Sequence, residues 1–341
     1  MGKASAAYCL AVSLVVLATL SLLSPSPVDA QQKILGEEHW VQSVSAADGK
    51  PLKIYLWEKR LNDLDVKQFA TAGRVVLLAH GATISGRVDF DPQIPEAGLT
   101  YSLMDYLAER GFDVFSLDYQ NYGRSDHHEC GLCVTTQVAA RDLHAAVDYI
   151  RTLRGVDRVH LLGWSWGATT TGLFTMHHPH KVKRLVLFAP PVWHALREKP
   201  PTTEFRTGTE EGYRKLFEPN ATEPGVAEAF AKEAMRWDPR SPNGVLMDLR
   251  ARMPILDPRQ ITVPVLIILG ELDSLTPTSQ SELPGFFADL ANPDKQFTIV
   301  PGAGHALHLR KPRLRFFVEV TKWFTIDQPG WRMEVIRGPK P

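Results

Sequence analysis

The sequence lacks a net charge, because its 38 Lys and Arg side chains balance its 38 Asp and Glu side chains. A balanced chain has no long-range attraction to nucleic acid or to an anionic membrane, so neither is expected as a partner. Internal repeats and the zinc-finger, P-loop and dinucleotide fingerprints are also absent, so we expect no cofactor and no bound metal. The length of 341 residues suits one large α/β domain with an insertion.

Cysteine is scarce, and the first of only three, Cys9, lies in an N-terminal segment that resembles a secretion signal. Lys3 supplies a positive start, residues 6–23 are apolar, and a Pro-rich stretch ends in a small residue at Ala30. We therefore expect a signal peptide over residues 1–30 and a secreted or periplasmic mature protein. The alternative is an uncleaved N-terminal anchor, because the apolar run is long for a signal. No other segment is apolar enough to span a bilayer.

Export would leave two cysteines in the mature chain, Cys130 and Cys133. We expect them to form a disulfide, because exported compartments let such bonds persist. The alternatives are two idle thiols or a metal site shared with His127 and His128, although no second ligand pair follows at finger spacing. Asn220 begins a glycosylation sequon, which matters only in a eukaryotic source.

The most informative motif has the form G-x-S-x-G and occupies residues 163–167, with Ser165 at its centre. An apolar run precedes it at residues 159–162, and a helix-compatible segment begins at Ala168. A serine between a buried strand and a helix is held on a sharp, strained turn with its hydroxyl exposed. The flanking glycines are required because a side chain there would collide with a neighbouring strand or helix.

Two candidate partners for this serine follow further along the chain. Asp273 comes just after the apolar run 263–270, and His305 lies on a Gly-rich loop after the predicted strand 296–300. The carboxyl ends of parallel strands share one edge of a sheet, so all three side chains should meet there. Their rivals are Glu271 and Asp248 for the acid, and His308 for the histidine. We expect the rivals to have no catalytic role.

With these residues in this order, the chain resembles the α/β-hydrolase family from about Lys53 to Phe324. His80 and the following residues to 83, after the strand 75–79, look like the family's His-Gly-x oxyanion loop. Residues 118–125 resemble its D-x-x-G-x-G-x-S turn, except that Asn121 replaces the first glycine. Asn tolerates left-handed backbone angles, so the turn should survive.

The resemblance implies a mostly parallel eight-stranded sheet with helices on both faces. It also implies a helical cap inserted after the sixth strand, where strand patterns stop; we call residues 190–261 the cap segment. The core would then comprise residues 31–189 and 262–325, and residues 326–341 would form a flexible tail. The remaining pattern predicts strands at 40–45, 52–57, 113–117 and 184–188, and helices at 102–110, 135–154, 225–237 and 313–323.

The implied chemistry is acyl transfer, with Ser165 as nucleophile, His305 as base and Asp273 as its orienting acid. The backbone N–H groups of Ala82 and Trp166 would stabilise the oxyanion. Trp164 is expected to pack in the core, whereas Trp166 either packs or lines an acyl pocket.

These features predict an exported hydrolase that acts on a small-molecule carboxylic ester or acylglycerol-like substrate. A serine aminopeptidase, a thioesterase and a non-catalytic binding protein of the same fold are the alternatives. No expectation is drawn for the oligomeric state.

Overall fold

A computed structural model describes residues 34–62, 65–94, 100–192, 199–217, 221–276 and 282–326. The predicted signal peptide, the sequon residue Asn220 and the tail beyond Ile326 lie outside these ranges. Within them, no helix has the length and apolar character needed to cross a membrane.

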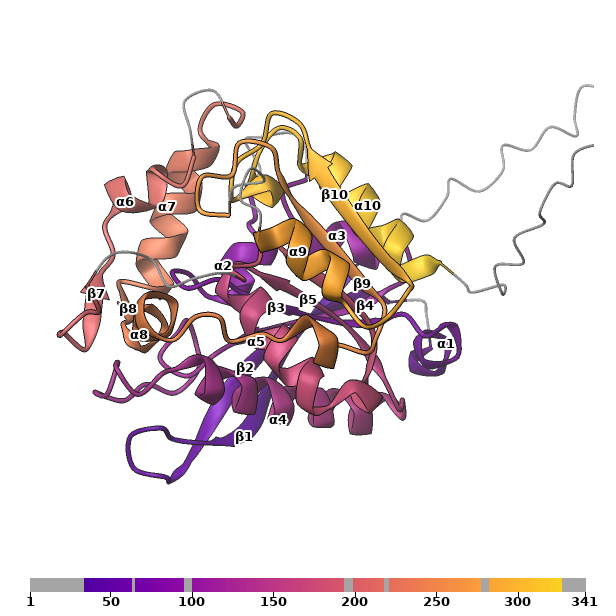
Figure 1. Cartoon of the computed structure of the whole chain (residues 1–341), viewed down its shortest axis with the longest axis horizontal. Coiled ribbons are helices and arrows are strands. Elements are labelled where there is room, and N and C mark those ends of the chain that lie inside the picture. Colours follow the sequence, from indigo (N-terminus) through magenta and orange to yellow (C-terminus); the bar gives the residue numbers. More distant parts are fainter. Residues whose placement is uncertain are drawn as a thin grey trace, which may run out of the picture. The chain divides into compact units, whose positions relative to one another are not determined.

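The centre of the fold is an eight-stranded sheet in the order β1-β2-β4-β3-β5-β6-β9-β10 (Figure 1). The pairs β1/β2 and β2/β4 are antiparallel, and the other neighbours are parallel. The strands are β1 (Ile34–Val44), β2 (Pro51–Leu61), β3 (Val75–Ala79), β4 (Asp113–Asp118), β5 (Val159–Trp164), β6 (Val182–Phe188), β9 (Val265–Gly270) and β10 (Lys295–Val300). Strands β3, β4, β5 and β9 are buried throughout, as their apolar runs predict.

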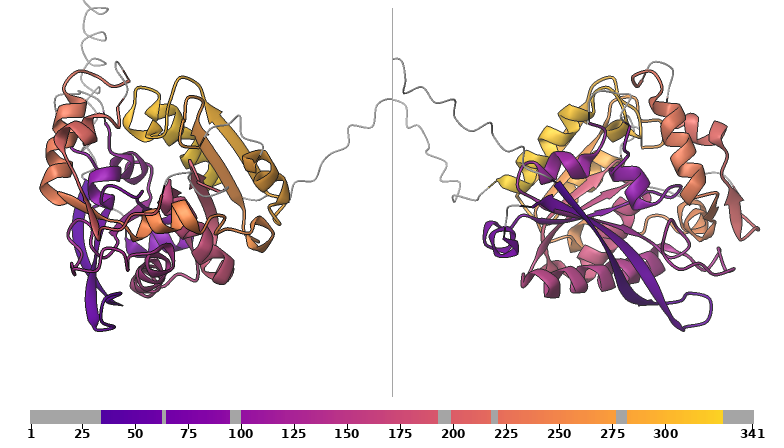
Figure 2. Two further views of the ribbon diagram at one scale, coloured as in Figure 1. Left: turned by 60° about the vertical axis from the view of Figure 1, so that its left-hand side comes forward. Right: turned by 180° about the vertical axis from the view of Figure 1, so that it is seen from behind.

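Helices cover both faces of the sheet, as the sequence predicts. On one face α4 (Thr136–Arg154) packs against α5 (Trp166–His177), and on the other α3 (Leu103–Ala108) packs against α10 (Arg313–Thr325). Figure 2 shows the β1–β2 hairpin as a long twisted ribbon at one side of the sheet. In the described part of the core, the structure adds three short helices that the sequence did not predict: α1 (Val66–Ala72), α2 (Gly86–Phe90) and α9 (Glu282–Asp289).

Helix α4 illustrates how local sequence sets the boundaries of an element. The Thr135 side chain accepts a hydrogen bond from the Val138 N–H at the start of the helix, and Gly155 ends it in a left-handed conformation. Leu143, Val147 and other apolar residues at helical spacing face the core. The predicted bounds of 135–154 therefore match the observed helix to within one residue.

The cap segment contains α6 (Glu210–Arg214), α7 (Val226–Trp237) and α8 (Gly244–Ala251), which Figure 1 shows grouped beside one end of the sheet. The expectation of no strand here is wrong, because β7 (Phe205–Thr207) and β8 (Arg240–Pro242) form a small antiparallel pair. Three-residue strands are too short to produce an alternating pattern in the sequence, which explains the miss.

We predict that Gly167→Ala destabilises the fold strongly. A Cβ atom at residue 167 would lie 2.2 Å from the Ala79 carbonyl oxygen and 2.5 Å from that of His80, and both are backbone atoms that cannot move aside. Such overpacking costs about 1–3 kcal/mol or more. Gly285→Ala in α9 is the matched control, since nothing lies within 4 Å of its added Cβ. Denaturant unfolding should show a loss only for the first variant; equal stabilities would contradict the prediction.

Candidate active site

Ser165 lies on the sharp turn between β5 and α5. Its backbone adopts φ 54° and ψ −121°, a combination that non-glycine residues rarely adopt. The Ser165 N–H donates to the Phe188 carbonyl at 2.8 Å, which ties the turn to the end of β6. An added Cβ at Gly163 would lie 2.2 Å from the Gly167 carbonyl oxygen, so the close approach expected from the motif is present.

The structure brings the three predicted triad residues together at the carboxyl edge of the sheet. His305 Nε2 lies 2.8 Å from Ser165 Oγ, and His305 Nδ1 lies 2.9 Å from Asp273 Oδ2. An ionised carboxylate only accepts hydrogen bonds, so Nδ1 carries the imidazole proton and Nε2 is left as the base facing Ser165.

Asp273 is buried and well supplied with donors. Its Oδ1 accepts from the N–H groups of Leu275 and Thr276, each at 2.9 Å, and the Thr276 hydroxyl donates to Oδ2. Burial opposes ionisation, but the hydrogen bonds from His305 and Thr276 outweigh it and hold the pKa of Asp273 below its usual value. The carboxylate therefore stays charged at neutral pH.

The rival residues point elsewhere. Glu271 accepts a hydrogen bond from the Gly302 N–H at 3.1 Å and braces the loop that precedes His305. Asp248 accepts from the Thr136 N–H, at the first turn of α4. His308 is buried, and its Nε2 bonds to Asp89 at 2.7 Å and not to Ser165.

The oxyanion loop, residues 80–83, is fixed by a buried histidine. His80 Nδ1 donates to the Gly81 carbonyl at 2.7 Å, and Nε2 accepts from the Tyr119 N–H at 3.2 Å. Burial lowers the pKa of His80 to about 3, so the ring is neutral and can accept at one nitrogen while it donates at the other.

The Gly81 carbonyl and the Ala82 N–H belong to the same planar trans peptide and point in opposite directions. The bond that fixes the carbonyl therefore also fixes the direction of the N–H. An added Cβ at Gly81 would lie 3.5 Å from the Ser165 Cβ, so this peptide passes directly beside the serine. Within the described part of the chain, the N–H groups of Ala82 and Trp166 have no hydrogen-bond acceptor. Both are therefore available to a substrate oxygen.

A serine on a strained turn, in line with a histidine and a buried carboxylate, is the geometry of a serine hydrolase. A family model described as "Serine aminopeptidase, S33" matches residues 94–311, which is more than half of the chain. The chain belongs to this family. It is a serine hydrolase of the α/β-hydrolase fold.

Individual relatives of this hydrolase are distant. The human serine hydrolase BPHL is 25% identical over 262 residues, which cover 72% of this chain and 78% of that protein. A proline iminopeptidase from Neisseria gonorrhoeae is 31% identical over 108 residues, or 30% of this chain. The chain matches only 34% of the iminopeptidase's length, and 17% of a poly(3-hydroxyalkanoate) polymerase subunit from Haloferax mediterranei. An esterase structure from Thermogutta terrifontis has a TM-score of 0.58 and 17% identity over 84% of this chain and 97% of that one.

Both tryptophans that flank Ser165 in this hydrolase have packing roles. Trp166 is fully buried, contacts the rings of His80 and Tyr119, and donates from Nε1 to the Thr136 hydroxyl at 2.9 Å. Trp164 donates from Nε1 to the His305 carbonyl at 2.9 Å and so holds the histidine loop. The acyl-pocket interpretation of the Trp166 side chain is therefore not supported by its burial.

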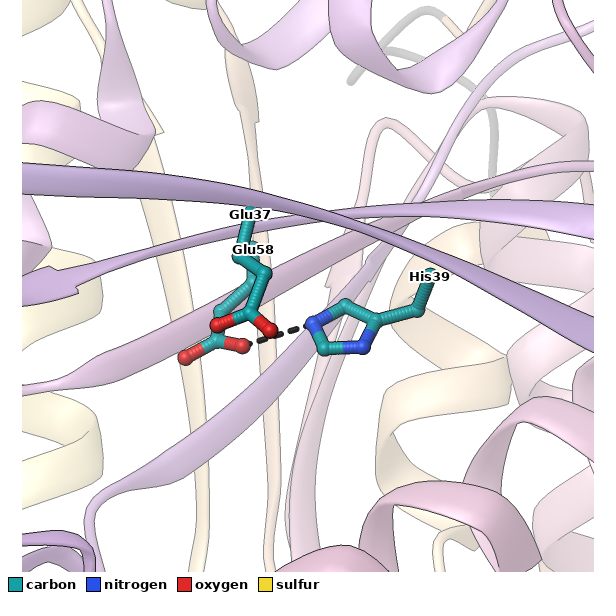
Figure 3. Close-up of side chains that lie close together, drawn as sticks. All are labelled: Glu37, His39 and Glu58. Atoms are coloured by element: carbon teal, nitrogen blue, oxygen red, sulfur yellow. Dashed lines mark hydrogen bonds and ion pairs between the residues drawn. The ribbon is translucent and has the colours of Figure 1, made fainter.

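The described residues contain one group of acidic and histidine side chains close enough to share a metal ion: Glu37, His39 and Glu58 (Figure 3). Glu58 Oε2 already bonds to His39 Nε2 at 2.7 Å, and Oε1 accepts from Arg60 and Arg154 at 2.6 Å each. These bonds outweigh the effect of burial and lower the pKa of Glu58 to about 2. Two guanidinium groups would repel a cation, so this group is an ion-pair network and does not fit a metal site.

We predict that Asp273→Asn lowers kcat by about a thousandfold to ten-thousandfold, because the amide stabilises the wrong His305 tautomer. Glu271→Gln is the matched control, since among the described residues its side chain bonds to the loop backbone at Gly302 and not to His305. It should change kcat by less than about threefold. Steady-state kinetics with an activated ester compare the two variants, and a reversed order of effects would mean that the acid is misassigned.

Proposed function

We propose that this protein is an exported hydrolase that cleaves carboxylic esters through an acyl-enzyme on Ser165. The observation that carries the proposal is the continuous hydrogen-bonded chain from Ser165 through His305 to Asp273. A serine hydroxyl is a weak nucleophile at neutral pH and needs a base within hydrogen-bond reach.

In the proposed reaction, His305 Nε2 removes the Ser165 proton as Oγ attacks the ester carbonyl carbon. The carbonyl oxygen becomes an oxyanion that accepts hydrogen bonds from the Ala82 and Trp166 N–H groups. Loss of one such donor typically costs about 3–4 kcal/mol of barrier. Collapse of the intermediate expels the alcohol, which takes its proton from His305. Water then releases the acid by the same steps, with His305 again acting as base.

The charges around the site favour an ester over a peptide with a free N-terminus. An ammonium group needs a carboxylate in the site, but in the described part of the chain the carboxylates of Asp89, Asp238 and Asp273 are all buried and hydrogen-bonded. The Arg206 guanidinium, by contrast, contacts the Ala82 carbonyl and brings a positive charge to the oxyanion loop. An aminopeptidase activity remains the second candidate, because the family description and the Neisseria relative favour it.

The cap segment is proposed to act as a lid that sets substrate size. Its residues Arg206, Asp238 and Ser241 bond to the loop that carries Ala82 or to the residues beside it, so the segment adjoins the Ser165 side of the sheet. A cover in this position would exclude water from the acyl-enzyme and limit the acyl chain.

Export is supported by the apolar N-terminal segment of the sequence and by Cys130 and Cys133, which form a disulfide. The disulfide loop contacts the cap segment. The Gly244 N–H donates to the Gly131 carbonyl at 3.0 Å, and the Leu132 N–H donates to Glu204 at 2.8 Å. By restricting this loop, the disulfide should therefore affect the position of the cap segment.

A fluorophosphonate should label the mature protein at Ser165, because the probe imitates the tetrahedral intermediate and needs both the nucleophile and the oxyanion donors. Ser165→Ala should abolish labelling and ester hydrolysis, and His305→Ala should lose nearly as much activity. Peptide mass spectrometry locates the label. Labelling of another residue, or full activity of the alanine variant, would contradict the proposal.

A p-nitrophenyl ester chain-length series, measured beside aminoacyl anilides and acyl thioesters, separates the candidate substrate classes. We expect esters to have the highest kcat/KM. An anilide preference of about tenfold or more would instead indicate an aminopeptidase.

Reduction of the disulfide should change substrate preference more than stability. Closing so short a loop contributes at most about 2 kcal/mol in the chain-entropy model. The double variant Cys130→Ser, Cys133→Ser should be insensitive to reductant and serves as the control. Intact mass after alkylation without reduction tests the bond itself, and two alkyl groups on freshly secreted protein would contradict it.

A further inference from the structure

A buried carboxylate of the cap segment lies between two backbone loops of the core. Asp238 directly follows α7 and is 1% exposed. Its Oδ2 accepts hydrogen bonds from both the N–H and the hydroxyl of Ser85, at 2.9 and 2.8 Å. Its Oδ1 accepts from the Gly123 N–H at 3.0 Å. The mechanism proposed above makes no use of this side chain.

Both loops that Asp238 joins adjoin the site. Ser85 comes two residues after the oxyanion loop and precedes α2; its hydroxyl makes no capping bond to that helix and donates to Asp238. Gly123 belongs to the turn after β4 and has φ +52°. An added Cβ at Gly123 would lie 2.6 Å from the Ser85 Cβ, so the two loops are already in contact.

Other residues of the cap segment hold the oxyanion loop itself. Arg206 donates to the Ala82 carbonyl, and the Ser241 hydroxyl donates to the Thr83 carbonyl at 2.9 Å. Within the cap segment, the Tyr213 hydroxyl donates to the Asp238 carbonyl and fixes the residue from the other side. Consecutive peptides next to the predicted oxyanion donor are therefore held by the cap segment as well as by the core.

We propose that Asp238 is a positioning residue: through its bonds to Ser85 and Gly123, the position of the cap segment determines the position of the Ala82 N–H. The inference rests on the proposed function, because it assigns Asp238 a role in the oxyanion site of that reaction. Loss of its carboxylate leaves backbone donors of Ser85 and Gly123 unpaired in a buried position, so the loops must shift to find new acceptors. A shift of about 1 Å near the reacting atoms can cost about a hundredfold in rate.

Three variants test this role. Asp238→Asn keeps the shape but turns one acceptor into a donor, which must face an N–H of Ser85 or Gly123. Ser85→Ala removes only the hydroxyl bond and is the milder probe. Asp248→Asn is the matched control, because Asp248 is another buried carboxylate of the cap segment, 3% exposed, and it bonds to the Thr136 N–H at the start of α4.

Each variant is measured at about pH 8.5, because burial, aided by the neighbouring Asp118, raises the pKa of Asp238 to about 7 and the side chain must be ionised. The readouts are kcat and KM for p-nitrophenyl acetate, the second-order rate of fluorophosphonate labelling, and the melting temperature. A small ester does not require contacts with the cap segment for binding. Its KM should therefore change little when the cap segment is displaced.

We expect Asp238→Asn to lower kcat and the labelling rate together by about tenfold or more, with KM within about twofold. Ser85→Ala should give a smaller loss, and the double variant should be no worse than Asp238→Asn alone, because both act through one contact. Asp248→Asn should lower the melting temperature comparably but kcat by less than about threefold.

The inference would be overturned if the two Asn variants lost kcat equally and in proportion to their losses of melting temperature. A general destabilisation of the cap segment would then explain both losses. An unchanged labelling rate in Asp238→Asn would overturn it too while leaving the proposed function intact. A wild-type protein that is not labelled at Ser165 would overturn the proposed function and this inference together. If Asp238→Asn does not fold, a normal labelling rate in Ser85→Ala would overturn the inference.

Discussion

The close approach of the turn around Ser165 to its neighbouring strands is the constraint on which the site depends. The serine backbone is held at a positive φ by its N–H bond to Phe188, and glycines on either side let carbonyl oxygens approach to distances that no side chain would allow. This turn aims Oγ out of the sheet edge and starts α5 at the next residue. Every other catalytic group is then placed by a loop that ends near the same point.

Those loops converge because parallel strands end at a common edge. The oxyanion loop follows β3, Asp273 follows β9 and His305 follows β10, so residues 140 positions apart in the sequence meet at the Ser165 hydroxyl. Buried aromatic and polar groups then hold each loop. Trp164 bonds to the His305 backbone. Next to Trp164, His308 pairs with Asp89, and burial raises the pKa of the Asp89 carboxyl. The result is a site whose backbone is fixed before substrate arrives, which electrostatic stabilisation of an oxyanion requires.

The cap segment completes this arrangement from outside the sheet. Its donors at Arg206 and Ser241 contact the oxyanion loop, and its carboxylate at Asp238 contacts Ser85, two residues further along the chain. Unpaired buried donors are costly, so the cap segment and the oxyanion loop stabilise each other's positions. Under the roles proposed for the cap segment and for Asp238, one segment influences both the size of the substrate and the chemical step.

The sequence by itself determined the fold class, the bounds of long elements such as α4, and the residues Ser165, Asp273 and His305, because each depends on a local pattern of apolar runs and turn residues. It also placed Asn121 in a left-handed turn, which the structure has at φ 67°. Only the tertiary structure decided that Trp166 packs, that His308 pairs with Asp89, and that Asp238 reaches Ser85. The Asp238–Ser85 contact joins residues 153 positions apart. The physical reason is that burial and hydrogen-bond partners depend on which distant segments the fold brings together, and no local spacing encodes that.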